Sequence, residues 1–483
     1  MPKSWLILIL AILYLTFLGR TGFLGPDEPR YASISREMAR SGDWVTPRLD
    51  GSGWFEKPPL LYWMTGAATR LRLHDEWAAR LPVALSSLAF LIFFFGAVER
   101  EFSARVAALA TAILATSAGW LAYSFVSLPD LPMSAALDAA VFIALFDTRP
   151  GHGLTKPAYT AGALLGLSIL AKGFVPVVLF APILLIARRK RWRIAVACLV
   201  VAAPWFILCI LRNGHVFWND FFWKHHVGRF LNGDLQHVQP FWYYLPIVLA
   251  GLFPWTPTVL LAVHPKSWRK VWDDQRVVVL ALWFVVGLVF FSLAKNKLPG
   301  YLLPLMPALA VILAVAVDRA PVVFSAVSVA VSLLLLILLP VIAAMLPDAL
   351  MVGVRRSFIA VFPGATVVLL AMLAAAISAF FIWSGRAQAA AFVAVLAVAG
   401  GLTWFKLATF PLLDQRVSVR AFWRANAGTA SSACIDPGVR RMWAYGLNYY
   451  APHPLPDCAA PSQPPYRIAE QNGKLMVTPS DIR

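Results

Sequence analysis

Long apolar segments recur along this 483-residue chain, and they limit its possible folds more than any other feature. Runs of about 17 to 25 apolar residues are long enough to cross a hydrocarbon layer about 30 Å thick. Hydrophobic residues make up 60% of the chain and charged residues 14%, whereas soluble domains carry about 25% charged residues. Every backbone N–H and C=O must be paired inside lipid, and the apolar runs lack strand-like alternation. We therefore expect an all-α membrane protein.

The apolar pattern predicts about thirteen membrane-spanning helices. The first run is expected to be a retained helix rather than a signal peptide, because no small-residue cleavage site follows it before Gly25. The predicted spans are 5–24, 81–98, 104–125, 130–147, 158–171, 173–187, 194–211, 242–263, 277–294, 303–317, 322–346, 359–383 and 389–409.

The formal net charge is +18, and we attribute it to membrane topology rather than to nucleic-acid binding. Basic clusters such as 188–193 fall in short loops, as expected on the cytoplasmic side. If Met1 is cytoplasmic, an odd number of spans places the C-terminus outside. The outer, periplasmic face then receives the long loops 25–80 and 212–240 and the short segment 295–302.

The outer loops and the tail suggest how the chain is organised. Residues 30–38, 60–73 and 217–230 carry apolar side chains at helical spacing beside basic ones, so we expect interfacial helices that roof the outer surface. The polar tail predicts a small periplasmic domain. The expected division is a transmembrane domain at 1–409 and a C-terminal domain at 410–483.

The four cysteines separate into two pairs. Cys434 and Cys458 lie in the polar tail, where an oxidising compartment would allow a disulfide. Cys198 and Cys209 share one predicted span and are about 16 Å apart along its axis. The second pair is therefore expected to remain reduced and buried.

Charged and hydroxyl side chains gather on the predicted outer face. Charged groups near a membrane are costly, so such a collection outside the loops that set topology indicates a functional site. Asp138, about two turns into its span, is instead expected to be an internal hydrogen-bonding partner. The candidate site residues are Asp27, Glu28, Arg30, Glu56, Lys57, Asp130, Lys172, Arg229, Lys295, Lys297 and Tyr301.

The mixture of charges suggests a phosphate-bearing substrate. Arg, Lys and a tyrosine hydroxyl can hold a lipid phosphate, and a nearby carboxylate can orient or deprotonate an acceptor. Neither the GxxxxGK[ST] nor the GxGxxG motif occurs, so we expect no nucleotide cofactor. Each residue also has a simpler explanation, such as a helix cap or a headgroup contact. A transporter or flippase of lipid-linked sugars is an alternative, although it should show repeats and polar groups near the midplane.

At these residues the chain resembles the bacterial aminoarabinose transferases that modify lipid A. They form part of the GT-C type membrane glycosyltransferases, which also include protein O-mannosyltransferases. The resemblance covers roughly residues 5–310. Its motifs are Pro26-Asp27-Glu28-Pro29-Arg30-Tyr31, Ser41-Gly42-Asp43-Trp44, Phe55-Glu56-Lys57-Pro58, Leu170-Ala171-Lys172-Gly173-Phe174, Phe221-Phe222-Trp223, Arg229-Phe230, Phe241-Trp242-Tyr243-Tyr244 and Ala294-Lys295-Asn296-Lys297-Leu298-Pro299-Gly300-Tyr301.

The resemblance implies a GT-C fold in the inner membrane and a donor sugar linked to undecaprenyl phosphate, with 4-amino-4-deoxy-L-arabinose as the leading sugar. The expected acceptor is lipid A or a related envelope glycan, and we expect a monomer. Attack by the acceptor from the face opposite the carrier phosphate would invert the anomeric configuration. A protein O-mannosyltransferase is the alternative within the same architecture.

The resemblance also implies roles for individual residues. Asp27 would be the catalytic carboxylate, and Asp130 matches a second acidic position beside the cavity. A divalent ion such as zinc would lie near Glu56 and a histidine of the second long loop, His225 or His226. The donor phosphate would be held by Arg30, Lys57, Lys172, Arg229 and Tyr301, with Glu28, Lys295 and Lys297 as further cavity candidates.

Overall fold

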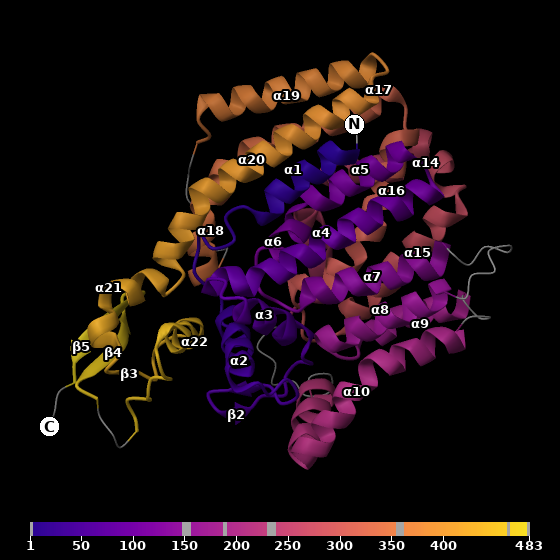
Figure 1. Cartoon of the computed structure of the whole chain (residues 1–483). Helices are drawn as coiled ribbons and strands as arrows, with labels where there is room; N and C mark the ends of the chain where they lie inside the picture. The colour runs from indigo at the N-terminus through magenta and orange to yellow at the C-terminus, as the bar shows by residue number, and fades with distance from the viewer. Residues whose placement is uncertain are drawn as a thin grey trace.

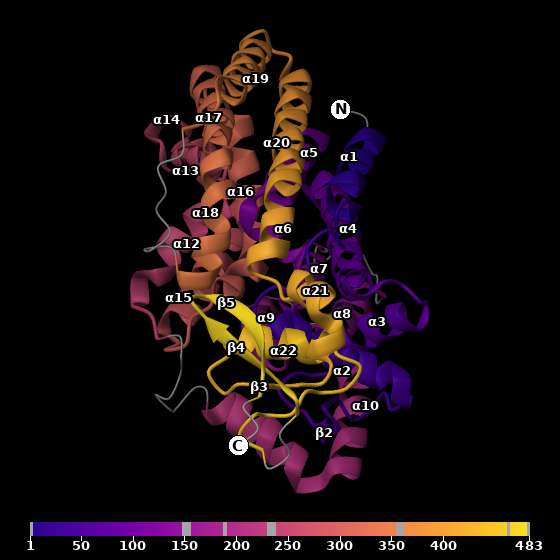
Figure 2. The same cartoon turned by 90° about the vertical axis from the view of Figure 1, so that its left-hand side faces the viewer.

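The structure, a computed structural model, describes residues 3–146, 156–186, 191–228, 238–353, 362–460 and 464–480. A bundle of long helices makes up most of it, and a small unit of helices and strands lies at one end (Figures 1 and 2). The expectation of a mainly helical membrane protein is confirmed.

The elements of the first half, in chain order, are α1 (Lys3–Leu15), α2 (Asp27–Ser41), β1 (Arg48–Leu49), β2 (Ser52–Gly53), α3 (Leu60–Arg70), α4 (Asp75–Glu101), α5 (Ala104–Thr116), α6 (Ala118–Tyr123), α7 (Asp130–Phe146), α8 (Lys156–Lys172), α9 (Val175–Ile186), α10 (Arg191–Phe217) and the π-helix η1 (Trp218–Gly228). The predicted outer segments 30–38, 60–73 and 217–230 are thus helical at 30–38, 60–70 and 217–228, whereas residues 71–73 follow the end of a helix. They correspond to α2, α3 and η1.

The elements of the second half are η2 (Phe241–Tyr243), α12 (Tyr244–Gly251), η3 (Thr256–Thr258), α13 (Val259–Val263), α14 (Pro265–Trp272), α15 (Gln275–Leu293), η4 (Pro299–Leu305), α16 (Met306–Arg319), α17 (Val322–Leu334), η5 (Leu335–Leu338), α18 (Leu339–Val352), α19 (Ala365–Trp383), α20 (Ala387–Arg416), α21 (Arg420–Ala430), β3 (Ala433–Ile435), α22 (Arg441–Tyr450), β4 (Tyr466–Gln471) and β5 (Lys474–Pro479).

Long apolar helices confirm a multi-pass membrane protein. By length and composition, 7 helices in the described residues can cross a membrane, or up to 8 if one bent pair forms a single span. The remaining predicted spans contain shorter or broken helices. The prediction missed these breaks because length and hydropathy along a sequence do not reveal where a helix bends. Thirteen crossings therefore stay a prediction.

Two predicted spans are wrong as single straight helices. The range 242–263 is divided between α12 and the η3–α13 segment, with a bend of 112° between them. Pro254 lies at this break and Pro257 lies in η3, and neither supplies a backbone N–H to continue a helix. The range 104–125 breaks at Ser117, whose backbone is extended between α5 and α6.

The bundle is packed around α16, which is buried along most of its length. Helix α8 packs against both α7 and α10, and α2 packs against α3. Both views place α2, α3 and β2 at one end of the bundle, away from α5 and α14 (Figures 1 and 2). We call this the α2 end.

The C-terminal unit lies at the α2 end and consists of α21, α22 and a three-stranded sheet in the order β3-β4-β5. Strand β3 is parallel to β4, and β4 is antiparallel to β5. The predicted disulfide is confirmed, because Cys434 of β3 is bonded to Cys458. Helix α22 packs on α2, so the unit lies against the α2 end of the bundle.

Candidate active site

Several charged side chains project from helix ends that meet at the α2 end. Asp27 is the first residue of α2 and Asp130 the first residue of α7, whereas Lys172 is the last residue of α8. Carboxylates near helix N-termini and cations near C-termini are favoured by the helix dipole. The fold therefore presents opposite charges at one end of neighbouring helices.

These helix ends border an open cavity of about 460 Å³. It brings together segments that lie far apart in the sequence, from the start of α2 to the start of α22. The predicted residues that line it are Asp27, Arg30, Glu56, Lys57, Asp130, Lys172 and Tyr301.

Arg30 organises one side of the cavity. A terminal nitrogen of its guanidinium lies 2.6 Å from Asp27 Oδ1 and 2.9 Å from Glu56 Oε2. The ammonium of Lys57 lies 3.4 Å from Glu56 Oε1. Burial acts to lower the pKa of Arg30, but Tyr31, Glu56 and Asp27 outweigh it and raise that pKa. Arg30 is therefore a fixed positive charge beside Asp27.

Lys172 and Asp130 form the opposite side. The Lys172 ammonium lies 2.5 Å from Asp130 Oδ1 and 4.6 Å from the centre of the Tyr301 ring. Gly300 packs against the same carboxylate, since a Cβ added there would lie 2.7 Å from Asp130 Oδ1 and 2.6 Å from the Tyr123 hydroxyl. Only glycine fits this approach of η4 to α7.

Two side-chain N–H groups of cavity-lining residues lack a hydrogen-bond partner among the described residues. Among the described residues, the Nε of Arg30 and the indole Nε1 of Trp54 are buried without a hydrogen-bond partner. A buried donor without a partner costs free energy. Both residues line the cavity.

Three residues predicted as further cavity candidates do not line it. Glu28 is buried and pairs with Arg80 at 2.6 Å, because the turn of α2 points it away from Asp27. Lys297 is buried and donates to the carbonyls of Gln239 and Ala294. Lys295 is exposed. A motif shows that these residues are close in sequence, but not which way each side chain points.

Part of the predicted site lies outside the described residues. This applies to Arg229, and also to the side chains of His225 and His226, whose backbone forms the end of η1. In the described part of the chain, no group of three or more His, Cys, Asp or Glu residues is arranged to hold a metal ion. Glu56, the predicted carboxylate ligand, is engaged by Arg30 and Lys57. The described residues thus form an ion-pair cluster, and the metal site stays a prediction.

The structure adds cavity residues that the sequence analysis missed. Asp220 and Lys224 line the cavity from η1, and Arg441 lines it from α22. The aromatic-basic stretch around 217–230 was a signal for the first two. No motif marked Arg441, because only the docking of the C-terminal unit brings it to the cavity.

One expectation about the bundle interior is wrong. Asp138 in α7 is fully buried, but neither of its carboxylate oxygens has a hydrogen-bond partner among the described residues. Hydropathy identified the charged position within the span but not the side chains that would face it.

An apolar cavity of about 250 Å³ adjoins the site. Its lining includes Tyr123, Pro299 and Leu303, and Tyr123 also approaches Gly300 beside Asp130. A lipid chain in this cavity would place an attached headgroup near Lys172 and Asp130.

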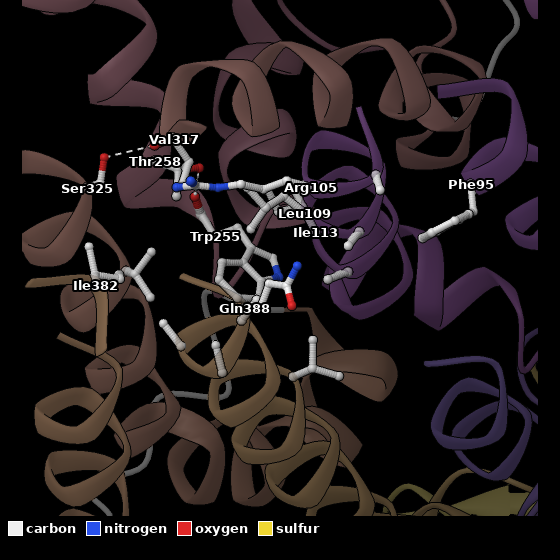
Figure 3. Close-up of a pocket in the computed structure, with 18 of the residues that line it drawn as sticks. Phe95, Arg105, Leu109, Ile113, Trp255, Thr258, Val317, Ser325, Ile382 and Gln388 are labelled. Carbon is white, nitrogen blue, oxygen red and sulfur yellow. Dashed lines mark hydrogen bonds between the residues drawn. The ribbon is translucent and has the colours of Figure 1, made fainter. Parts of the chain in front are cut away.

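A third cavity of about 200 Å³ lies between the helices away from the α2 end (Figure 3). Apolar side chains such as Leu109, Ile113 and Trp255 line most of it. Arg105 at its edge is paired with Asp318 at 2.8 Å. This cavity lacks the clustered carboxylates and cations of the candidate site.

Comparison with known proteins supports the reading of this geometry. The family model for dolichyl-phosphate-mannose-protein mannosyltransferases matches residues 56–212. The chain is 35% identical over 332 residues to the undecaprenyl phosphate-alpha-4-amino-4-deoxy-L-arabinose arabinosyl transferase of Pectobacterium carotovorum. The aligned region covers 65% of this chain and 58% of that protein. The corresponding protein of Pseudomonas aeruginosa is 30% identical over 328 residues, or 64% of this chain and 58% of that one. The match thus spans less than two thirds of these relatives' length.

A solved structure extends the likeness over nearly the whole chain. The crystal structure of ArnT from Cupriavidus metallidurans bound to undecaprenyl phosphate superposes with a TM-score of 0.76 and 26% identity, covering 94% of this chain and 86% of that one. The resemblance to the aminoarabinose transferases and to their GT-C type fold is therefore confirmed.

Proposed function

We propose that this chain transfers a sugar, 4-amino-4-deoxy-L-arabinose or a close relative, from undecaprenyl phosphate to lipid A or a related envelope glycan. The reaction would take place at the periplasmic face of the inner membrane. The observation that carries the proposal is the single cavity holding Asp27, Arg30, Lys57, Lys172 and Tyr301 beside an apolar cavity. The likeness to the aminoarabinose transferases supports the choice of donor.

The cavity's charges suit the bond that must break. In the donor, the phosphate is a diester with one negative charge. When the bond from the anomeric carbon to its oxygen breaks, the phosphate becomes a monoester and its charge rises to two. Lys57, Lys172 and Arg30 would stabilise that added charge, because preorganised cations act most strongly where water is partly excluded. No acid is needed to protonate this leaving group.

The role of Asp27 depends on the acceptor. A hydroxyl acceptor must lose a proton, and Asp27 would then act as the base. A phosphate acceptor is already anionic, and Asp27 would instead orient the donor sugar through its amino group. Attack from the face opposite the carrier phosphate would invert the anomeric configuration in one displacement.

The position of the C-terminal unit supports a periplasmic site. The Cys434–Cys458 disulfide lies in that unit, and disulfides persist in oxidising compartments such as the periplasm. Because α22 packs on α2, the unit and the cavity belong on one side of the membrane.

A divalent ion near Glu56 and a histidine of η1 stays a separate proposal, and no step above depends on it. Purified protein would be assayed after exhaustive chelation and again after zinc is restored. Loss and recovery of transfer would support the ion, whereas unchanged turnover would exclude a need for it.

Mass spectrometry tests the proposed function directly. Lipid A and periplasmic proteins would be compared between cells with and without the gene, and a pentosamine mass on lipid A alone is the expected result. A hexose on periplasmic proteins would favour protein O-mannosylation, the activity named by the family model that matches residues 56–212. No change in either would contradict both functions.

A further inference from the structure

Helix α22 of the C-terminal unit borders the candidate active-site cavity at its N-terminal end. Its first residue, Arg441, lines the cavity and is exposed. The helix is fixed at its other end, where the Tyr449 hydroxyl donates to Asp75 at 2.8 Å and the Tyr450 hydroxyl donates to Glu76 at 2.6 Å. The neighbouring Arg440 donates to Glu470 at 3.0 Å. Arg441 is therefore held at the cavity by both ends of its helix.

Arg441 differs in charge pairing from the other basic residues of the cavity. Arg30, Lys57, Lys172 and Lys224 each have a carboxylate partner. Within the described ranges, Arg441 has no carboxylate partner, and its recorded contacts are with the hydroxyl and ring of Tyr445. An unpaired guanidinium at an open cavity is a ready site for an anion.

The position of Arg441 separates it from the proposed donor-phosphate residues. The Tyr445 ring centre lies 5.7 Å from the Arg441 guanidinium and 5.6 Å from that of Arg30. Arg441 thus lies next to the Arg30 and Asp27 side of the cavity. The apolar cavity adjoins the opposite side, near Asp130 and Lys172.

We infer that Arg441, supported by Tyr445, binds an anionic group of the acceptor, a phosphate monoester carried by a lipid. The inference rests on the proposed function and deepens it, since it assigns acceptor recognition to the C-terminal unit. The guanidinium binds two phosphate oxygens in its fork geometry and leaves a third oxygen facing the donor sugar.

The reaction balances with such an acceptor. An oxygen of the dianionic acceptor phosphate forms a bond to the anomeric carbon as the bond to the carrier phosphate oxygen breaks. The acceptor becomes a phosphodiester with one negative charge, and the carrier becomes a monoester with two. Total charge is conserved, and no proton is released. Arg441 faces the acceptor phosphate throughout.

The test compares Arg441→Gln with the wild-type protein in detergent, using undecaprenyl-phosphate-linked aminoarabinose as donor and lipid A carrying both phosphates as acceptor. Losing a charge-assisted hydrogen bond predicts a rise of about tenfold or more in the KM for lipid A. The KM for the donor should stay unchanged, and Arg441→Lys should restore part of the acceptor affinity. Arg424→Gln, at an exposed arginine of α21 outside the cavity, is the matched control.

Binding is measured separately, so that the inference is tested even without turnover. Wild-type protein should bind bisphosphorylated lipid A more tightly than the dephosphorylated lipid, and Arg441→Gln should lose that difference. If Arg441→Gln keeps the same preference for bisphosphorylated lipid A as the wild type, the inference is overturned. A rise in the KM for the donor instead of the KM for the acceptor would overturn it as well. If wild-type protein shows the binding preference but transfers no sugar, the proposed function fails and the anion site stands.

Discussion

Arg80 and Glu28 form a buried two-pronged ion pair, with Nε 2.6 Å from Oε1 and one terminal nitrogen 2.8 Å from Oε2. Arg80 also donates to carbonyl oxygens in the loop 18–22. Glu28 accepts from the backbone N–H groups of Leu24 and Ser127. The pair therefore joins the loop that leads to α2 with the loop that leads to α7.

Removing one charge of this pair should lower the stability of the folded protein. Glu28→Gln leaves the Arg80 guanidinium buried with a weaker partner, and breaking a buried pair in this way typically costs about 3–5 kcal/mol. We expect a lower unfolding temperature in detergent, measured by intrinsic tryptophan fluorescence. The double variant Glu28→Gln with Arg80→Met, which leaves no buried charge, should recover part of the loss. Equal unfolding temperatures for wild type and Glu28→Gln would contradict this account.

Asp27→Asn should preserve the fold and abolish transfer. The Asp27 side chain is 45% exposed, so the amide fits without a packing change, but the negative charge at the cavity is lost. We expect turnover to fall by at least about 10²-fold, with donor binding retained. Glu37→Gln, on α2 but outside the cavity, serves as the control. Near-normal turnover of Asp27→Asn would refute its assigned role.

Gly300→Ala should damage the site by a purely steric effect. The new methyl group would lie 2.7 Å from Asp130 Oδ1 and 2.6 Å from the Tyr123 hydroxyl, so the carboxylate and the tyrosine must move. We expect reduced kcat in the transfer assay. In contrast, Gly428→Ala on α21 meets nothing within 4 Å and should leave kcat unchanged. If the two variants have the same kcat, the close approach of η4 to α7 at Gly300 is not required for catalysis.

The anchoring of α22 should weaken in acid. Hydrogen bonds from Arg440 lower the pKa of Glu470 below its usual value of 4.5. A lowered folded-state pKa gives stability that is present above the unfolded pKa and is lost as pH falls through the folded pKa. The Arg440 and Glu470 side chains are 29% and 16% exposed. We therefore expect their ion pair to contribute about 1 kcal/mol to the free energy of unfolding. The unfolding temperatures of wild type and Glu470→Gln should differ at pH 7 and converge once the pH has fallen below the lowered pKa of Glu470. A constant difference would exclude this pair as the cause.

Much of the site could be predicted from the sequence because its residues lie in short local motifs. Asp27 and Arg30 share one turn of α2, and their ion pair follows from a spacing of three residues. Glu56 and Lys57 are adjacent in the sequence, so their contact is also local, although Pro58 and Pro59 separate them from α3. Local spacing predicts such pairs because helix geometry fixes which neighbours share a face.

Other features depended on contacts between distant segments. Glu28 has the same motif context as Asp27 but faces Arg80, 52 residues away. The bend within 242–263 and the missing partner of Asp138 also escaped prediction, since hydropathy reports the apolar content of a segment and not its path or neighbours.

The sequence by itself determined a helical membrane protein, because apolar runs in lipid can satisfy their backbone only as helices. It also determined the chemical types gathered at one face: carboxylates, cations and a tyrosine. Only the tertiary structure decided that Arg441 reaches the cavity and that Lys297 does not. Side-chain direction and the docking of α22 on α2 arise from packing between segments hundreds of residues apart, which no local pattern encodes.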